Sequence, residues 1–293
     1  MASLLSRLAP LVITLRGSKR MFSSAERTLR RVEQLRQKPA GFAPPPSLAR
    51  TTRVSRRDVD GWPIFEVEPL GADPEHTVVY LHGGCYVFEI DPVHWALIGR
   101  LAVEASVRVV VPIMPLAPAG TASTVVPRVA DLVAAYDPAT VSLVGDSSGG
   151  GMALAVAMAL RDRESAPLHH VVLISPWLDI SGTDPRLAEI APRDPWLAVP
   201  GTHAAGALYR AELGEGDWRV SPIYGSLEGI GPVTMFSGTR DILNADAHRL
   251  LPLAADAGLD LDFHEGPGMI HNYPILPMPE GDAARTVIVD AVR

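Results

Sequence analysis

Short apolar runs that alternate with helix-length segments constrain the fold of this chain more than any other feature of its sequence. Runs that are apolar along their whole length indicate strands covered on both faces, which is typical of a parallel sheet with right-handed helical crossovers. The pattern therefore predicts an α/β fold with a mostly parallel sheet. Six such runs are "TVVYLH" (77–82), "VRVVVP" (107–112), "VSLVG" (141–145), "HVVLIS" (170–175), "VTMFSG" (233–238) and "LDLDFHE" (259–265).

Two earlier runs, at about 51–58 and 63–68, predict an antiparallel hairpin at the start of the sheet, which brings it to eight strands. The segments between the runs predict helices that flank the sheet. The sequence has no internal repeat or low-complexity tract, which excludes repeat architectures. The expected helices lie at about 93–105, 124–136, 149–162, 244–257 and 280–292.

The N-terminal region predicts an amphipathic helix, which the proline-rich stretch at 38–47 ends. The apolar run Leu8–Leu15 faintly imitates a secretion signal, but it is short, has basic flanks and lacks a convincing cleavage site. A helix that crosses a bilayer needs about 20 apolar residues, so no stable membrane insertion is expected. The basic residues that follow favour a solvated helix face, although contact with anionic lipid stays open.

The interval 178–228 differs from the rest of the chain because it is rich in Pro, Gly and Asp and holds only short helical segments. An insertion of this kind between two core strands is where a lid over a functional site would lie. A surface insertion without such a role is the alternative. We expect an N-terminal helical segment at 1–50 and one main α/β domain at 51–293 that carries this insertion.

Composition limits the partners and the compartment of the chain. Its 293 residues include 33 acidic and 26 basic ones, so no electrostatic footprint for nucleic acid is present. The single cysteine, Cys85, excludes an internal disulfide and a cysteine-rich zinc site, which suits a reducing compartment. We therefore expect a cytoplasmic protein without a nucleic-acid partner, and a homodimer stays possible.

The strand-to-helix turn in "VSLVGDSSGGGMALAVAMALRDR", residues 141–163, admits three interpretations. A phosphate-binding loop would need a lysine and a hydroxyl residue after the glycines, where Met152 and Ala153 stand. A dinucleotide fingerprint fails because Ser147 occupies the place of its second glycine. What remains is G-x-S-x-G, from Gly145 to Gly149, which singles out Ser147 as a nucleophile.

The physics of a nucleophile elbow explains this composition. The sharp turn forces Ser147 into a strained backbone conformation that projects its hydroxyl group, and side chains two residues away would clash. Glycine at 145 and 149 removes that clash. A serine–glycine turn without any chemistry is the alternative interpretation of this motif taken alone.

A nucleophilic serine needs a base and an orienting carboxylate, which follow in the order Ser, Asp, His in this architecture. Asp241 comes directly after the run at 233–238, and His271 lies on a glycine-bordered loop after the final run. Both are our candidates for these roles. The competing carboxylates are Asp246 and Asp179, and the competing histidines are His264, His94, His203 and His248.

The loop "YLHGGCYVF" at 80–88 predicts an oxyanion hole, because glycines let backbone N–H groups approach a substrate oxygen. Its candidates are Gly83, Gly84 and Cys85, together with the amide of Ser148 directly after the nucleophile. His82 is the expected organiser of the loop.

Together these motifs resemble the hormone-sensitive-lipase-like branch of the α/β-hydrolase fold, whose bacterial members are mostly carboxylesterases. The resemblance covers about residues 75–275. It implies that the segment 1–50 joins the insertion at 178–228 as a helical cap over an acyl pocket, and that no metal or organic cofactor is needed. The motifs that carry it are "HGGC" (82–85), "GDSSGG" (145–150), "DPWL" (194–197), "SPIY" (221–224), "GTRD" (238–241) and His271.

The chain departs from the family pattern at two places. Cys85 stands where the family has the third glycine of its oxyanion loop, and "PIMPLAPAG" at 112–120 replaces a charged "DYRLAPE" segment. The resemblance implies a serine carboxylesterase that acts on small- to medium-chain esters through an acyl-enzyme. An amide or peptide hydrolase with the same triad and a non-catalytic ligand receptor are the alternatives.

Overall fold

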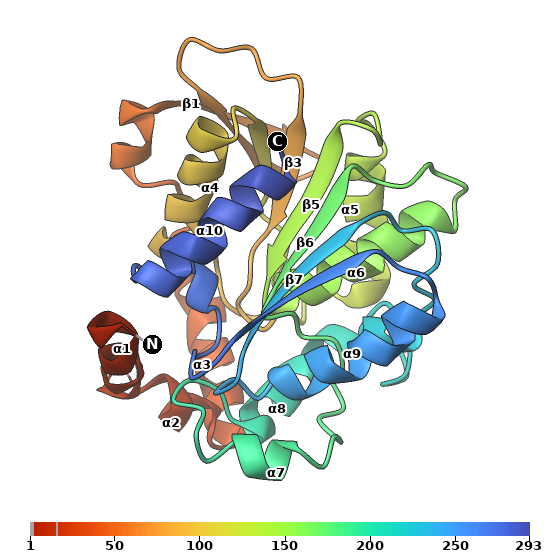
Figure 1. The fold of residues 1–293 in the computed structure, drawn as a ribbon. Coiled ribbons are helices and arrows are strands. Elements are labelled where there is room, and N and C mark those ends of the chain that lie inside the picture. Colours follow the sequence, from red (N-terminus) through yellow and green to blue (C-terminus); the bar gives the residue numbers. More distant parts are fainter. Residues whose placement is uncertain (1–2, 16) are drawn as a thin grey trace.

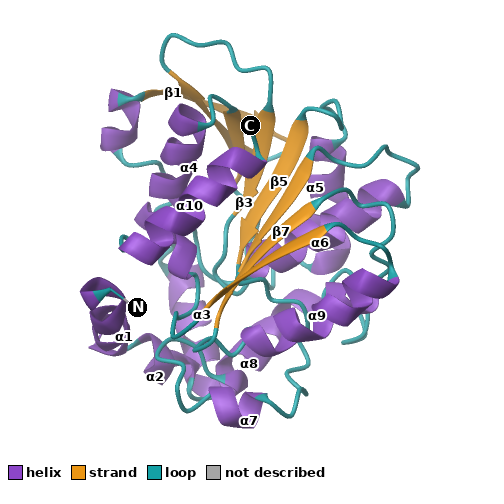
Figure 2. Ribbon diagram, in the orientation of Figure 1, coloured by secondary structure: helices purple, strands orange, loops and turns teal. Residues whose placement is uncertain are grey.

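A computed structural model describes residues 3–15 and 17–293 of the chain, and it contains one eight-stranded sheet (Figure 2). The strands lie in the order β1-β2-β4-β3-β5-β6-β7-β8. The first three in this order pair antiparallel with one another, and all the others pair parallel, so the expected α/β-hydrolase sheet is confirmed. The strands are β1 (Thr52–Val59), β2 (Trp62–Pro69), β3 (Thr77–Leu81), β4 (Arg108–Pro112), β5 (Val141–Asp146), β6 (His170–Ile174), β7 (Val233–Gly238) and β8 (Leu261–Gly266).

Helices cover both faces of the sheet, because successive side chains of each buried strand point to opposite sides. In β3, Val78 and Tyr80 belong to one apolar cluster, whereas Val79 and Leu81 belong to the other. Figure 1 shows the corresponding helices on the two sides of the sheet. One side carries α4 (Pro92–Glu104) and α10 (Pro279–Ala291), and the other carries α5 (Ala122–Val133), α6 (Ser148–Arg161) and α9 (Asn244–Asp256).

The N-terminal region is broken into three helices, which corrects the expectation of a single amphipathic one. Gly17 adopts a left-handed conformation with φ of 78° and ends the first helix, and Ser24 caps the third by accepting a hydrogen bond from the Arg27 amide. Residues 1–2 and 16 of the predicted segment 1–50 lie outside the described residues. The helices are α1 (Leu4–Leu15), α2 (Ser18–Phe22) and α3 (Ala25–Gln37), followed by the short turn η1 (Pro46–Arg50).

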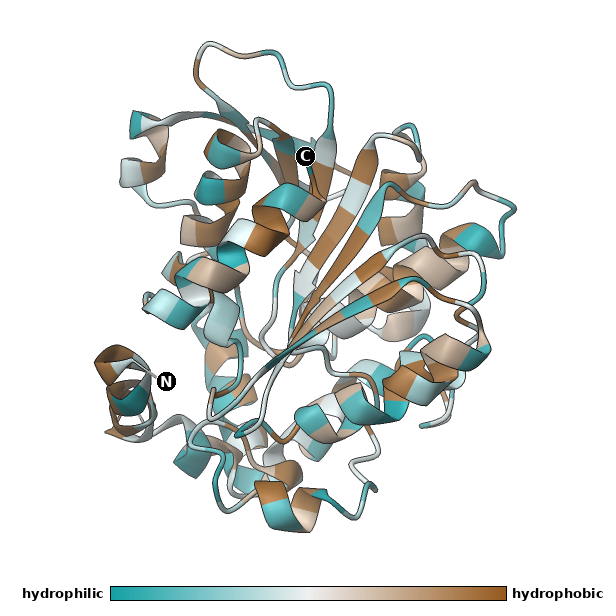
Figure 3. Ribbon diagram, viewed as in Figure 1, coloured by the Kyte–Doolittle hydropathy of each residue, from teal (hydrophilic) through white to brown (hydrophobic). Residues whose placement is uncertain are grey.

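Helix α1 exposes several leucines, including Leu4, Leu8 and Leu15. Figure 3 shows brown segments on this helix. Its first turn is held by Glu280 at the start of α10, whose carboxylate accepts hydrogen bonds from Ser3 and Ser6. Within the described residues, no helix is long and apolar enough to cross a membrane.

The N-terminal helices pack against the insertion that follows β6. This insertion contains α7 (Leu187–Ile190), α8 (Val199–Arg210) and η2 (Pro222–Tyr224), and Figure 1 shows α2, α3, α7 and α8 gathered at one end of the sheet. The contact is close at Gly201 in α8, where a Cβ atom would lie 2.5 Å from the Cα atom of Phe22 and from the Thr28 hydroxyl. Two segments far apart in sequence therefore share one tightly packed interface.

A Gly201→Val substitution is expected to lower the free energy of unfolding by about 1–3 kcal/mol, because the new side chain overpacks this interface. Urea unfolding measures the effect, and limited proteolysis should show earlier cleavage within residues 17–37. Gly214→Val is the matched control, since a Cβ atom at Gly214 has no neighbour within 4 Å. Equal stability of the two variants would contradict the packing described here.

Candidate active site

Ser147 lies at the junction of β5 and α6 in a conformation that L-residues rarely adopt, with φ of 53° and ψ of −121°. Its backbone is held from two sides, because its N–H group donates to the Ile174 carbonyl and its own carbonyl accepts from the Trp177 amide. A Cβ atom at Gly145 would lie 2.2 Å from the Gly149 carbonyl oxygen, and one at Gly149 would lie 1.9 Å from the Leu81 carbonyl oxygen. Both glycines are therefore required by the turn.

His271 and Asp241 meet in a buried hydrogen bond of 2.8 Å between Nδ1 and Oδ2. Asp241 follows β7, and its Oδ1 accepts from the Leu243 amide at 2.9 Å, which fixes the carboxylate. His271 lies on the loop after β8 with its ring nearly perpendicular to the Trp196 ring, at 5.5 Å between centroids. The imidazole is held by its Nδ1 atom, which leaves Nε2 for proton transfer.

Ser147 and His271 line one cavity of about 300 Å³. Among the described residues, no hydrogen bond joins the Ser147 hydroxyl group to the imidazole. Such bonds are often long in the absence of substrate and tighten when substrate is bound. The cavity is lined from the N-terminal helices by Ser18, Met21, Phe22 and Arg31, from the loop after β3 by Gly84, Cys85, Phe88 and Glu89, and from the insertion by Trp196 and Leu197.

Carboxylates raise the pKa of His271 above its ordinary value of 6.5. Burial lowers this pKa, but the charge of Asp241 and its hydrogen bond, with smaller contributions from Asp194 and Asp146, more than offset the effect. A positive imidazolium is therefore stabilised next to Ser147, as proton transfer from a nucleophilic serine requires.

Asp194 is a second carboxylate behind His271 and Asp241, to which the sequence analysis assigned no role. It accepts hydrogen bonds from the amides of Trp196 and Leu197 through Oδ1 and from the Ile242 amide through Oδ2. Burial and the charge of Asp241 raise its pKa. It ties the insertion to the turn that carries Asp241.

The predicted oxyanion loop divides into two parts. The Gly83 amide donates to Asp146 Oδ1 at 2.9 Å, so its N–H group already has a partner inside the protein. The amides of Gly84, Cys85 and Ser148 donate to no acceptor among the described residues and lie beside Ser147. Gly84 and Cys85 have φ of 125° and 52°, and a Cβ atom at Gly84 would lie 2.4 Å from the Phe88 carbonyl oxygen.

Asp146 connects the parts of the site. Its Oδ1 accepts from the Tyr80 hydroxyl group at 2.8 Å and from the Gly83 amide, and its Oδ2 accepts from the Asn272 amide group at 2.7 Å and contacts His94 Nε2 at 3.2 Å. Burial raises its pKa, but His94 and these hydrogen bonds outweigh burial and lower it to about 2. The carboxylate therefore stays charged.

His82, the expected organiser of the loop, has a smaller part. Its Nδ1 lies 2.7 Å from the Gly83 carbonyl oxygen, and burial lowers its pKa to about 4, so the ring is neutral and donates this bond. Asp146 organises the loop instead. The sequence contained a signal for this, because Asp146 stands inside the G-x-S-x-G motif, but its partners could not be read from the motif.

The competing candidates have partners of their own. Asp179 and Asp246 both bind Arg249, and His264, His248 and His203 lie against Asp262, Glu265 and Glu215. Of these histidine and aspartate competitors, only His94 lines the cavity that contains Ser147 and His271, and there it contacts Asp146. In the part of the chain that the structure describes, no group of three or more His, Cys, Asp or Glu side chains could hold a metal ion.

Comparison with known proteins agrees with this geometry. A family model described as "alpha/beta hydrolase fold" matches residues 78–275. The chain belongs to the α/β-hydrolase family.

Its relatives are named as esterases and lipases. The chain is 31% identical over 288 residues to a putative acetyl-hydrolase, LipR, of Mycobacterium tuberculosis, a match that covers 94% of this chain and 90% of the relative. It is 33% identical to a triacylglycerol lipase of the same organism over 80% of this chain, but the match spans only 51% of that lipase. This α/β hydrolase is therefore of the esterase and lipase type.

Solved structures give the same result. An esterase from the bacterial hormone-sensitive lipase family has a TM-score of 0.82 and 26% identity, with 100% of this chain and 99% of that chain covered. A putative esterase from Staphylococcus aureus has a TM-score of 0.85 and 25% identity, with 94% and 95% covered. The resemblance to the hormone-sensitive-lipase-like branch is thereby confirmed.

Replacing Gly84 by alanine tests the loop beside Ser147. The new Cβ atom would collide with the Phe88 carbonyl group, so the amides of Gly84 and Cys85 would move; loss of one oxyanion donor typically lowers kcat by about 10²–10³-fold. Turnover of p-nitrophenyl butyrate measures the effect. Gly216→Ala is the control, because a Cβ atom there is unobstructed, and an unchanged kcat in Gly84→Ala would contradict the assignment.

Proposed function

We propose that this protein is a serine carboxylesterase that hydrolyses small- to medium-chain carboxylic esters through an acyl-enzyme. The observation that carries the proposal is the buried hydrogen bond between His271 and Asp241 at the rim of the cavity that also contains Ser147. The esterase and lipase names of the relatives support the same reaction.

In the first half of the reaction, the Ser147 hydroxyl oxygen attacks the ester carbonyl carbon while its proton passes to His271 Nε2. Asp241 stabilises the resulting imidazolium. The negative charge that develops on the carbonyl oxygen is stabilised by the amides of Gly84, Cys85 and Ser148, which have no acceptor within the protein. When the tetrahedral intermediate collapses, the C–O bond breaks and the alcohol leaves with the proton from His271.

In the second half, water attacks the acyl carbon and gives its proton to His271. Collapse of the second intermediate releases the carboxylic acid and returns the proton to Ser147. The dipole of α6 points its positive end at this site and favours the negative charge of both intermediates. No step needs a metal or an organic cofactor.

The two cap segments complete the proposal. We assign residues 1–50 and about 178–228 to a cap over the catalytic domain at 51–293, because both segments contribute side chains to the cavity. Met21 and Phe22 come from the N-terminal segment, and Trp196 and Leu197 come from the insertion. A cavity of about 300 Å³ with these apolar walls suits acyl chains of a few carbon atoms.

Ser147→Ala is expected to abolish turnover of p-nitrophenyl acetate and butyrate, with a loss of more than about 10⁴-fold, because it removes the nucleophile. Initial rates measure the loss, and circular dichroism checks the fold. Ser226→Ala, at an exposed position, is the control and should keep its activity. Substantial turnover by a folded Ser147→Ala protein would rule out the acyl-enzyme route.

The raised pKa of His271 predicts the acid limb of the pH profile. His271 must be neutral to accept a proton, so kcat/KM should fall as the pH drops through a pKa above 6.5. Asp241→Asn removes the largest contribution that raises this pKa, so the acid limb should move to lower pH while kcat falls by about 10⁴-fold. Profiles of kcat/KM for both proteins test this. A limb at the same pH in both would show that Asp241 does not act on His271.

A further inference from the structure

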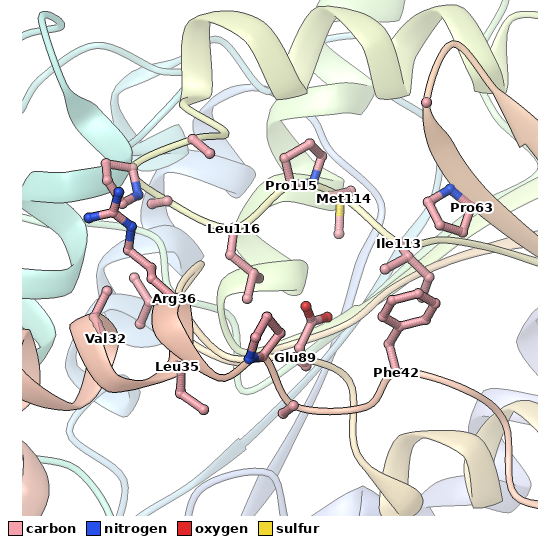
Figure 4. Close-up of a pocket in the computed structure, with 17 residues that line it drawn as sticks. Val32, Leu35, Arg36, Phe42, Pro63, Glu89, Ile113, Met114, Pro115 and Leu116 are labelled. Carbon is pink, nitrogen blue, oxygen red and sulfur yellow. The ribbon is translucent and has the colours of Figure 1, made fainter.

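A second cavity of about 290 Å³ adjoins the catalytic one, and no role has been assigned to it above. Figure 4 shows its walls, which come from α3, from the linker after α3 and from the loop that follows β4. Most of its lining is apolar, including Val32, Leu35, Phe42, Ile113, Met114 and Leu116. Glu89 is the residue that lines both cavities, so its side chain lies at the place where they meet.

Glu89 is the only acidic residue among the described residues that line the second cavity. Its Oε2 atom is buried and has no hydrogen-bond partner, and burial raises its pKa to about 7. Figure 4 shows its carboxylate among apolar side chains, pointing toward Met114.

The nearby arginines do not neutralise this carboxylate. Arg36 lines the second cavity, but its guanidinium group donates to Glu33 at 3.0 Å. Arg31 lines the catalytic cavity and donates to Gln34. Among the described residues, no ion pair involves Glu89.

Glu89 is half-buried, and its buried Oε2 atom is costly to leave unpaired, since it loses its hydration and gains no hydrogen bond in return. Elsewhere in this site the buried carboxylates are satisfied, as Asp146 is by Tyr80, Gly83 and Asn272. Glu89 lines the cavity that also contains Ser147 and His271, and it lines the second cavity, whose walls are mostly apolar. These walls suit a hydrocarbon chain, and the carboxylate suits a cation at its end.

We propose that the second cavity is a subsite for an ester whose acyl or alcohol arm ends in a protonated amine, with Glu89 as the counter-ion. This inference rests on the proposed esterase function and names the substrate class of the same site. The ammonium group supplies the hydrogen bonds that Glu89 Oε2 lacks. The methylene groups pack against the apolar walls, and the scissile carbonyl group lies beside Ser147.

Matched pairs of substrates test the proposal on each arm. For the acyl arm, p-nitrophenyl 6-aminohexanoate is compared with p-nitrophenyl heptanoate, in which a methyl group replaces the ammonium group. For the alcohol arm, 2-(dimethylamino)ethyl butyrate, whose amine is protonated, is compared with 3-methylbutyl butyrate. The measured quantity is the ratio of kcat/KM for the cationic substrate to that for its neutral partner, so that effects on the chemical step cancel.

Glu89→Gln keeps the size of the side chain and removes its charge, so it should lower this ratio at least about 10-fold on one arm. Glu75→Gln is the matched control, because it removes one negative charge at an exposed loop before β3 and should leave both ratios unchanged. Ratios that are equal in wild type and Glu89→Gln on both arms would overturn the proposal.

A binding measurement separates this proposal from the proposed function. Calorimetry with the Ser147→Ala protein should show saturable binding of n-hexylammonium that weakens at least about 10-fold when Glu89→Gln is added. 1-Hexanol is the neutral probe and should bind both proteins alike. Equal binding of n-hexylammonium to both proteins would overturn the subsite. Failure of the wild type to hydrolyse p-nitrophenyl butyrate would overturn the esterase function instead.

Discussion

The buried carboxylate of Asp146 is the interaction on which the arrangement of the site depends. Its two oxygen atoms hold Gly83 of the loop after β3, Asn272 of the loop after β8, and Tyr80 and His94 from the sheet and α4. Each of these partners is more than fifty positions away in the sequence. This one charged group fixes the positions of loops that would otherwise be independent of one another. A loop that moved away would leave a buried polar group unpaired, which costs free energy in a low-dielectric interior.

The fold and the candidate side chains Ser147, Asp241 and His271 could be predicted from the sequence for a physical reason. Gly145 and Gly149 are required because a Cβ atom at either position would lie about 2 Å from backbone atoms. The elbow can therefore be recognised from the local sequence. Asp241 and His271 follow directly after strands whose composition already marks them. In a mostly parallel sheet, the residues that follow successive strands lie along one edge of the sheet. Residues far apart in the sequence are therefore close together in space.

Other features depend on contacts that no local pattern reveals. The N-terminal region breaks at Gly17 and Ser24, where its sequence predicted one continuous helix, and the helices that result pack against α8. The direction of the Gly83 amide, toward Asp146, is likewise set by a partner 63 positions away. The proposed cap likewise depends on long-range contacts, because its two segments touch one another at Gly201 and Phe22 and both line the cavity.

Cys85, the only cysteine of the sequence, is buried in the loop beside Ser147, and burial raises its pKa to about 12. Almost none of its thiol is ionised near neutral pH. Because the thiolate is the reactive form, maleimides and iodoacetamides should modify Cys85 only slowly. The native protein is thus a convenient background for site-selective labelling. A cysteine introduced at an exposed position would carry a fluorophore or spin label without first removing the native thiol from the oxyanion loop.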